Sequence, residues 1–559
     1  MSITPSIKRV LRRGGGAASV WLPPGRGPEA WQHLVGRARV AEGRRVLRGQ
    51  KDPEGAERLV APLLESPVGS RAWALVAEAR DRVGDRTGAL DAARRAAVAE
   101  PVAFEGLLVH HRLTAVTDPD QARSALDALL EERPRNRSDV EAVLVALRSA
   151  DESSVERYRA NLMRWGRLGY EEHLAEVSKE IELVATATDD PGRLDVGLAQ
   201  VTAHLRRPLP VVTRALDRSR LWDRLVAYVL EHPLPTDAPV PTKAAAAAEL
   251  RRAATRALAA GRSSAAETLA AHALALRPDD RYAQETWANA SDQLAVVRDG
   301  WRPVEPRPAR RKVVREGAVL SALAQSMPHT SGGYATRTHG VLTGLAALGW
   351  DVAAVTRPGF PYDRWPSADP RVVPDQDEID GIRYHRVLDD RRRYPQYPLA
   401  SYVAGYADAL ERHARSHGAS LIHASSFHVN GLAAQAAAAR LGVPFVYEMR
   451  GLEELMKVSR DPSFATSDRY AFLEHLETTI CHSADRVFVI TEALRQLMVE
   501  RGVPASKLVV LPNGVHVDRF EPRPRDAELE AALGLAGKTV IGYAGGLVDY
   551  EGLDLLLEA

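Results

Sequence analysis

Two kinds of hydrophobic pattern divide the chain near residue 300. Before that point, alanine and leucine recur at the three- and four-residue spacing of amphipathic helices, and strand-like runs are rare. Beyond it, short β-branched runs alternate with helical stretches. Residues 301–311 hold three prolines and four arginines and little that could be buried. We predict an α-helical region over 29–300, a Pro/Arg-rich linker over 301–311 and an α/β domain over 312–520.

The helical region contains two stretches with the same spacing of apolar and small residues. Six matches follow the first residue of each stretch at offsets of 4, 11, 16, 20, 23 and 28 residues. The stretches are Trp73, Ala77, Gly84, Ala89, Ala93, Ala96 and Pro101, and Leu250, Ala254, Gly261, Ala266, Ala270, Ala273 and Pro278. The pattern resembles the tetratricopeptide repeat, an antiparallel helix pair in which glycine ends the first helix and proline stops the second. Generic alanine-rich hairpins are the alternative.

A third, weaker copy of the pattern contains Ala122, Leu126, Leu129 and Pro134. Between residues 138 and 235 the chain still has helical periodicity, but its register cannot be followed. Stacked repeats of this kind offer a groove for a protein partner, and the sequence does not identify that partner.

The alternation after the linker predicts a doubly wound, Rossmann-like sheet of parallel strands with right-handed crossovers. The predicted strands are Ala318–Ala324, Val352–Thr356, Ile382–Val387, Leu421–Ala424, Phe445–Glu448, Val487–Thr491 and Leu508–Leu511. The predicted helices are Tyr334–Leu348, Leu399–His417, Gly431–Leu441, Asp468–Ser483 and Glu492–Arg501. Ligands of such sheets bind at the carboxyl ends of the strands, so the residues just after each strand are the candidate site residues.

Two glycines, Gly332 and Gly333, lie between the first predicted strand and its helix. They would let the backbone approach a ligand closely, and the helix N-terminus would face an anion such as a diphosphate. The alternative is an ordinary tight turn. The chain has neither the G-x-x-x-x-G-K-[ST] motif nor the G-x-G-x-x-G spacing, which disfavours a P-loop nucleotidase and a nicotinamide or flavin enzyme.

Polar side chains also follow two later strands. His423, His428 and Asn430 lie around the end of the fourth strand, where they could donate to sugar hydroxyls or transfer protons. The alternative is that the histidines are hydrogen-bonded structural residues. Glu448 and Arg450 end the fifth strand and could bind a polar acceptor, or form an ion pair inside the domain.

Composition narrows the class of protein. The 559 residues carry 74 Lys and Arg against 73 Asp and Glu, which disfavours a nucleic-acid binder that relies on a basic surface. The single cysteine, Cys481, excludes an internal disulfide framework and is expected to be a buried core residue. No apolar run approaches the roughly 18 residues that cross a bilayer, and the basic N-terminus lacks a signal-type apolar region. We expect a cytoplasmic protein with disorder over 1–28.

Taken together, the loops of the second half resemble the N-terminal domain of the GT-B family-4 glycosyltransferases. The segment Leu511–Phe520 is similar to the stretch that crosses to the second domain of that family, and Gly542–Leu547 looks like the first strand and glycine turn of that domain. Residues 521–559 would then be the crossover and the start of the donor domain. The loop segments that carry this resemblance are Ser331–Arg337, Asp351–Thr356 with Arg357–Gly359, Ile422-His423 with His428, and Tyr447–Gly451.

The resemblance implies transfer of a sugar, with retention, from a nucleotide-sugar donor to an acceptor hydroxyl in glycan or polysaccharide biosynthesis. It implies that Gly332, Gly333, Gly545 and Gly546 contact the donor phosphates. His428 would orient groups or handle protons near the transferred sugar. The acceptor wall would contain Tyr334, Arg337, Glu448 and Arg450. No cofactor and no metal ion are expected besides the donor.

Some positions depart from the family pattern. Gly546 and Glu551 stand where the family commonly has Arg and Lys beside the diphosphate, and the downstream carboxylate pair has no counterpart. We therefore expect the 559 residues to be a fragment that cannot turn over donor alone.

The rival interpretation is a non-catalytic helical-repeat adaptor with a degenerate glycosyltransferase-like domain, and a third is a nucleotide-sugar epimerase. Arg391–Arg393, with Tyr394 and Tyr397, could contact a membrane surface or form a solvated loop.

Overall fold

The structure is a computed structural model that describes residues 29–47, 52–167, 169–189, 191–234, 237–301, 314–365, 369–388, 394–515, 517, 520–545 and 551–559. The segments 1–28 and 302–311, predicted as a disordered N-terminus and most of the linker, lie outside the described residues, as does Arg391–Arg393. Contacts divide the chain into two compact units. The first comprises Met1–Ala253 and Ala275–Pro278, and the second Ala254–Leu274 and Asp279–Ala559.

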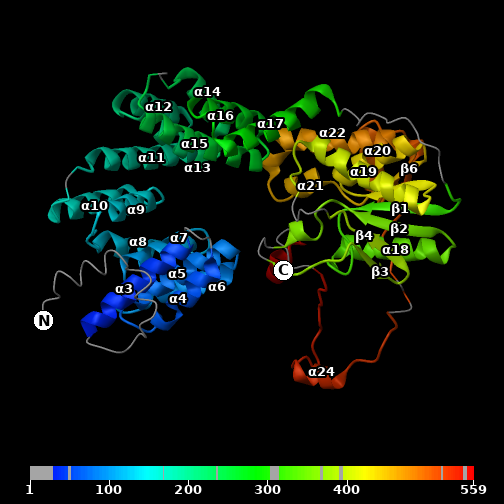
Figure 1. Ribbon diagram of the computed structural model, residues 1–559, viewed down its shortest axis with the longest axis horizontal. Coiled ribbons are helices and arrows are strands. Elements are labelled where there is room, and N and C mark those ends of the chain that lie inside the picture. Colours follow the sequence, from blue (N-terminus) through cyan, green and yellow to red (C-terminus); the bar gives the residue numbers. More distant parts are fainter. Residues whose placement is uncertain are drawn as a thin grey trace. The chain divides into compact units, whose positions relative to one another are not determined.

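The N-terminal region is a series of α-helices, as predicted (Figure 1). In order they are α3 (Glu29–Arg45), α4 (Pro53–Val60), α5 (Gly69–Val83), α6 (Arg86–Val98), α7 (Phe104–Thr114), α8 (Pro119–Glu131), α9 (Arg137–Leu147), α10 (Glu152–Arg164), α11 (Glu171–Asp189), α12 (Pro191–His204), α13 (Pro208–Arg218), α14 (Trp222–Glu231), α15 (Val240–Ala259), α16 (Ser263–Leu276) and α17 (Arg281–Asp299), with the 3₁₀ turn η2 (Ala61–Leu63).

The two predicted repeats are the helix pairs α5/α6 and α15/α16. Gly84 and Gly261 follow the first helix of each pair with nearly the same left-handed backbone, at φ of 84° and 85°. Such a conformation favours glycine, which explains the shared position in the pattern. Pro101 and Pro278 come just after α6 and α16 end. The expectation of tetratricopeptide-like helix pairs is therefore confirmed.

The second half contains an eight-stranded sheet in the order β3-β4-β2-β1-β5-β6-β7-β8. All neighbouring strands pair in parallel except β3 and β4. The doubly wound, Rossmann-like class predicted from the sequence is confirmed. The strands are β1 (Ala318–Leu323), β2 (Asp351–Thr356), β3 (Gln376–Ile379), β4 (Ile382–His385), β5 (Leu421–Ser425), β6 (Phe445–Met449), β7 (Arg486–Val489) and β8 (Leu508–Val510).

Helices cover both faces of this sheet (Figure 1). The larger core lies under α19, α20 and α22 and includes Cys481, which is buried as expected. Leu342 of α18 packs over the other face with residues of β1, β2 and β4. The helices are α18 (Gly333–Ala347), α19 (Leu399–His417), α20 (His428–Leu441), α21 (Glu453–Val458), α22 (Asp468–Ser483), α23 (Glu492–Glu500), α24 (Ala527–Ala532) and α25 (Leu553–Glu558), with 3₁₀ turns η3 (Tyr362–Arg364), η4 (Pro462–Thr466) and η5 (Ala505–Lys507).

One predicted strand is not found among the described residues. The stretch around Gly542, expected to begin a second Rossmann-like domain, has no strand over 538–545. Ile541 and Val540 are exposed there, at 79% and 52%. A strand needs a neighbour to satisfy its backbone groups, and the described residues provide none at this position. Among the same described residues, no helix combines the length and apolarity required to span a membrane.

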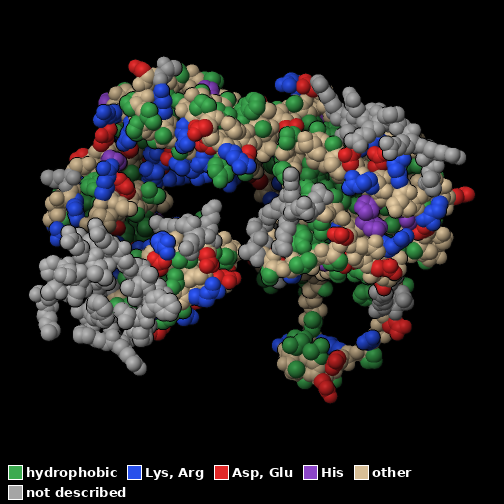
Figure 2. All heavy atoms as spheres, in the orientation of Figure 1, with side chains coloured by type: hydrophobic (Ala, Val, Ile, Leu, Met, Phe, Trp, Pro, Cys, Tyr) green, Lys and Arg blue, Asp and Glu red, His purple; other side chains and the backbone are tan. Residues whose placement is uncertain are grey.

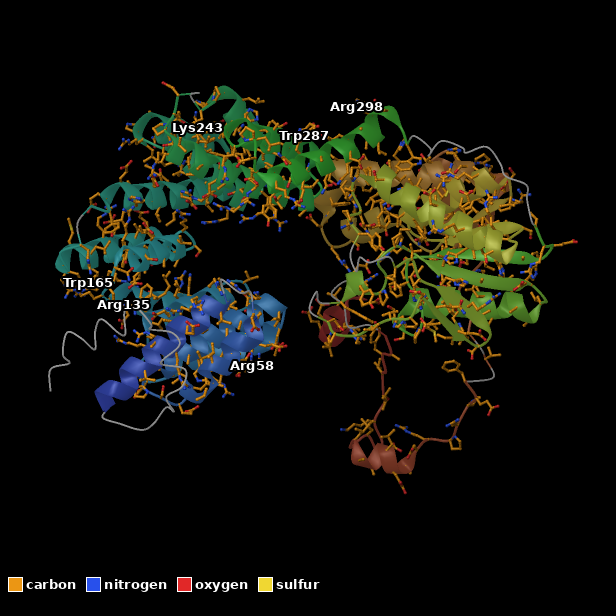
Figure 3. All side chains as sticks on the ribbon, in the orientation of Figure 1. Arg58, Arg135, Trp165, Lys243, Trp287 and Arg298 are labelled. Atoms are coloured by element: carbon orange, nitrogen blue, oxygen red, sulfur yellow. The ribbon has the colours of Figure 1, made fainter. Side chains whose placement is uncertain are left out.

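The last helical hairpin packs against the α/β domain within the second compact unit. Asp468, the first residue of α22, accepts hydrogen bonds from the backbone N–H (2.8 Å) and Oγ (3.0 Å) of Ser264. Asp292 of α17, a helix marked by Trp287 and Arg298 in Figure 3, accepts from the Leu399 N–H at 2.8 Å. This contact caps α19, whose own Pro398 offers no side-chain cap. The hairpin thus supplies part of the α/β domain's own packing.

Gly261 gives a direct test of that junction. A Cβ at Gly261 would lie 2.8 Å from the Cβ of Arg469, whereas a Cβ at Gly84, at the same repeat position and φ, would meet nothing within 4 Å. We expect Gly84→Ala to cost about 1–2 kcal/mol for the left-handed backbone. Gly261→Ala should cost about 1–3 kcal/mol more, since the crowded contact must open. Urea denaturation of the two variants measures the difference in the free energy of unfolding. Equal losses of stability would contradict the close contact between Gly261 and Arg469.

Candidate functional site

A cavity of about 820 Å³ opens at the carboxyl edge of the sheet. Its described walls come from the segments that follow β1, β6, β7 and β8. The strand order reverses beside β1, and doubly wound sheets bind ligands at the carboxyl edge near such a reversal. Four predicted site residues, Gly333, Tyr334, Arg337 and Arg450, lie among its walls. The other described lining residues are Thr336, Gly340, Val341, Ile490, Leu511, Pro512, Asn513, Gly514, Val515 and Phe520.

The N-terminus of α18 forms one wall of this cavity. Gly332 is the N-cap residue and has no side chain that could accept hydrogen bonds from the first helical turn. A Cβ at Gly332 or Gly333 would meet nothing within 4 Å, so open space lies in front of both. An uncapped helix N-terminus facing open space favours an anionic ligand.

Glu448 at the end of β6 is the centre of a buried ionic network. The carboxylate is 1% exposed and accepts from Arg337 Nε and Arg450 Nη2, each at 2.7 Å. Burial alone would raise the pKa of Glu448, but hydrogen bonds and charges from His423 and Arg450 outweigh it and hold the pKa well below the ordinary carboxyl range. Glu448 is therefore ionised and fixes two arginines at the cavity wall.

Arg337 connects the network to the segment after β8. Its Nη1 donates to the Pro512 carbonyl at 3.0 Å and to Asn513 Oδ1 at 2.7 Å, and its Nη2 donates to the Leu511 carbonyl at 3.0 Å. With Nε on Glu448, the guanidinium is held at both ends. Arg337 therefore positions the neighbouring wall of the cavity, and its predicted part in binding the acceptor stays a prediction.

Arg450 is held in a similar way. Its Nη1 donates to the Tyr334 carbonyl at 2.9 Å and to Thr338 Oγ1 at 2.6 Å. The Tyr334 ring packs against Phe427, with ring centres 5.6 Å apart. Glu448 and Arg450 thus form the ion pair that was the alternative interpretation of the sequence, and their role in acceptor binding stays a prediction.

Two residues that the sequence did not place in a network extend it through the sheet. His423 of β5 lies with Nε2 3.4 Å from Glu448 Oε2 and Nδ1 2.7 Å from Ser321 Oγ of β1. These contacts suit a proton on Nε2, donated to Glu448, while Ser321 donates to Nδ1. The adjacent parallel strands explain the meeting, because Ser321 and His423 are register partners in the sheet.

His428, the predicted catalytic residue, is the first residue of α20 and is only 7% exposed. Its ring packs edge-on against Phe472, and among the described residues its buried Nδ1 has no hydrogen-bond partner. It is not one of the described cavity-lining residues. Burial, with the Arg469 charge nearby, lowers the pKa of His428 to about 3. The imidazole is therefore neutral near pH 7, and proton handling by it stays a prediction.

The buried imidazole makes stability depend on pH. The pKa of His428 is about 3 when folded against an ordinary 6.5, so between these values only the unfolded chain binds the proton. Stability from this group is complete above pH 6.5 and is lost as the pH falls toward 3, by up to about 1.4 kcal/mol per pH unit. We expect His428→Asn to remove that slope between pH 4 and 6, and the exposed His204→Asn to keep it. Urea denaturation at each pH measures the free energy of unfolding. An unchanged pH slope of that free energy in His428→Asn would contradict the low pKa of His428.

The remaining predicted donor residues do not join the cavity. Gly545 lies in a stretch without regular structure and is not among the described lining residues. Gly546 lies outside the described residues. Among the described residues, no group of three or more His, Cys, Asp or Glu side chains is arranged to hold a metal ion.

The domain that carries this site has known counterparts. Residues 332–514, which run from the glycines of α18 to the segment held by Arg337, match the family model described as a glycosyl transferase 4-like domain. The match covers about a third of the chain. Among the predicted site residues, Gly332, Gly333, Tyr334, Arg337, His428, Glu448 and Arg450 lie within it.

Two curated proteins resemble the chain, both named D-inositol 3-phosphate glycosyltransferase. The protein of Kineococcus radiotolerans is 28% identical over 261 residues, which cover 45% of this chain and 57% of that protein. The protein of Streptomyces scabiei is 29% identical over 165 residues, 29% of this chain and 36% of that protein. The chain therefore matches about half the length of the first relative and about a third of the second.

A solved structure, an O-GlcNAc transferase variant of Thermobaculum terrenum, is 12% identical and covers 89% of this chain and 77% of its own, with a TM-score of 0.19. A TM-score this low does not show a common arrangement.

Proposed function

We propose that the protein transfers a sugar, with retention, from a nucleotide-sugar donor to an acceptor hydroxyl. The observation that carries the proposal is the cavity at the carboxyl edge, where the uncapped N-terminus of α18 faces open space beside the Glu448 network. The matching glycosyltransferase 4-like domain supports the same reaction class. We extend the proposal to glycan or polysaccharide biosynthesis in the cytoplasm.

The leaving group of such a reaction is a nucleoside diphosphate, so negative charge grows on phosphate oxygens as the glycosidic bond breaks. Fixed N–H dipoles at a helix N-terminus stabilise such charge without having to reorganise. Gly332 and Gly333 allow the phosphate to approach because no side chain covers them. The positions of Gly332 and Gly333 thus suit the role proposed from the sequence.

The acceptor is proposed to lie against the wall made by Tyr334, Arg337 and Arg450. Arg337 and Arg450 share the one carboxylate of Glu448 and donate other N–H groups to carbonyl oxygens, so both are fixed in place while one positive charge is left over. Such a wall suits the hydroxyl or phosphate groups of an acceptor. The relatives act on D-inositol 3-phosphate by their names, so a polyol or polyol phosphate is the first acceptor class to test.

A transfer assay tests the function directly. The native protein, expressed over its whole reading frame, is incubated with a panel of nucleotide sugars and acceptors that includes inositol, inositol 3-phosphate and short glycans. Mass spectrometry should detect an acceptor that gains one sugar residue, and NMR of the product should show the anomeric configuration of the donor. Absence of transfer with every pair would favour the non-catalytic adaptor, and inversion would refute retention.

The proposed site needs no divalent ion. If helix N–H groups stabilise the diphosphate, EDTA at millimolar concentration should leave the initial rate of sugar transfer within about twofold of the untreated rate. Rates measured after dialysis against EDTA, with and without added Mg²⁺ or Mn²⁺, check this. A rate that disappears with EDTA and returns with one of these ions would show that a metal stabilises the leaving group.

A further inference from the structure

The first compact unit contains a regular set of ionic contacts between neighbouring helix pairs. Charged residues about 34 residues apart meet on the first helices of successive pairs, at the period of the repeats. The pairs are Arg71–Glu105 at 3.2 Å, Arg214–Glu180 at 2.7 Å and Arg214–Glu249 at 3.3 Å. Residues that repeat at one spacing on successive first helices form a continuous strip along a helical stack.

Positive charge exceeds negative charge on this strip around Glu180 of α11. The Glu180 carboxylate is fully buried, and Arg148, Arg214 and Arg218 lie around it at 3.6, 2.7 and 3.1 Å. Glu249 of α15 pairs with Arg252 at 2.6 Å and with Arg214. Among these described residues, four guanidinium groups face two carboxylates. Figure 2 shows Lys and Arg side chains gathered over α11, α13 and α15.

The exposed fractions of these side chains determine whether a ligand meets positive or negative charge. The side chains of Arg148, Arg218 and Arg252 are 25%, 37% and 45% exposed, whereas those of Glu180 and Glu249 are 0% and 14% exposed. Arg214 is 14% exposed, like Glu249, so Arg148, Arg218 and Arg252 form the exposed layer over the two carboxylates and Arg214. Among the described residues, Arg148 Nε and Arg214 Nη2 are buried without a hydrogen-bond partner. The two carboxylates therefore do not satisfy all donors of the cluster, and an incoming anion would meet the exposed parts of Arg148, Arg218 and Arg252.

A second cluster repeats this design around Glu105 of α7, four helices before α11 in the same unit. Glu105 of α7 accepts from Arg71 and from Arg135 (labelled in Figure 3), and Arg44 lies 3.6 Å away. Burial by itself would raise the pKa of Glu105, but its own backbone hydrogen bond and the three arginines hold the pKa below its ordinary value. Asp139 shares Arg135, so three cations face two anions. The half-buried Glu105 and the buried Glu180 of one helical unit thus each organise several arginines.

We propose that the arginine surface around Glu180, formed by Arg148, Arg214, Arg218 and Arg252, binds an acidic peptide segment of a partner protein. The planar guanidinium fork matches a carboxylate, and discrete carboxylates on an extended chain can take successive arginines along the strip. Glu249 lies between Arg214 and Arg252, so an evenly charged phosphate backbone would meet repulsion that a peptide with spaced acidic side chains avoids. The chain's balanced net charge of +1 also disfavours a polyphosphate ligand.

A peptide-binding experiment on the 559-residue chain tests this surface. The probe is a fluorescein-labelled octaglutamate peptide, followed by fluorescence anisotropy, with octaglutamine as the uncharged comparison. We expect saturable binding of octaglutamate that weakens as NaCl rises from 50 to 300 mM, because salt screens exposed charges. Arg218→Gln should raise the Kd about tenfold, the effect of one charge-assisted hydrogen bond, since Arg214 still pairs with Glu180.

Arg224→Gln is the matched control. Arg224 lies on α14, the second helix of its pair, is 46% exposed and pairs with Asp195, so the substitution removes the same charge elsewhere. We expect the Kd of Arg224→Gln to equal that of the unaltered chain. Arg252→Gln is a second test variant, and it leaves Glu249 paired with Arg214. It should raise the Kd for octaglutamate to the same degree as Arg218→Gln. If circular dichroism shows that Arg218→Gln does not fold, the Kd of Arg252→Gln tests the proposal instead.

Four results would overturn the proposal. They are no saturable binding of octaglutamate, equal binding of octaglutamine, equal loss in the Arg218 and Arg224 variants, and displacement of octaglutamate by inorganic phosphate or single-stranded oligothymidylate at the concentration at which unlabelled octaglutamate displaces it.

Discussion

Glu448→Gln is expected to lower the free energy of unfolding of the α/β domain by about 3–5 kcal/mol, the cost of leaving buried cations without their partner. The carboxylate is 1% exposed and holds both Arg337 and Arg450 at 2.7 Å. A neutral amide keeps the shape but removes the negative charge that the two guanidinium groups share. Urea denaturation followed by circular dichroism measures the loss. Hydrogen exchange should show that the amides of β6 and of the N-terminal turns of α18 lose protection first.

Glu378→Gln is the matched control for this substitution. Glu378 lies on β3 of the same sheet and is exposed, so the same change of chemistry removes a solvated charge. A loss below about 0.5 kcal/mol is expected there, as for surface substitutions in general. If the two variants lose the same stability, Glu448 does not organise the network that the contacts describe.

The doubly wound half was predictable because its strands and helices differ in local pattern. The predicted helices Leu399–His417 and Asp468–Ser483 match α19 and α22 at both ends. The β3 strand, Gln376–Ile379, was missed because three of its four residues are polar, and its burial alternates only between exposed and half-buried. An edge strand that pairs antiparallel with β4 gains its order from that partner, which no local pattern records.

The candidate site was predictable as a location and less so as a set of contacts. Gly333, Tyr334, Arg337 and Arg450 meet at one cavity because their segments follow strands that end at the same edge of the sheet. That Glu448 serves two arginines could not be read from the sequence, since Arg337 lies 111 residues away. The burial of His428 was equally hidden, because the packing of Phe472 against its ring depends on how α22 meets α20.

The helical half shows a similar division between what is local and what is not. Gly84 and Gly261 match in sequence and in φ, because the need for a left-handed residue after the first helix is local. Their surroundings differ, since only Gly261 touches the α/β domain. The arginine clusters around Glu105 and Glu180 need partners from neighbouring repeats, so they emerged only from the structure.

Gly333→Leu is expected to lower kcat/KM for sugar transfer by about a hundredfold or more, since it puts a side chain where the donor diphosphate would meet the helix N-terminus. Gly333 is the first residue of α18, lines the cavity and has open space at its Cβ position. Replacing a helical glycine should leave folding intact or stabilise it by up to about 1 kcal/mol.

Gly344→Leu, also in α18 with nothing within 4 Å of its Cβ, is the matched control because Gly344 is exposed and not among the described lining residues. Initial rates over a range of donor concentrations, with melting temperatures for both variants, separate a blocked site from a damaged fold. Equal activity of the two leucine variants would show that the donor does not bind at this helix N-terminus.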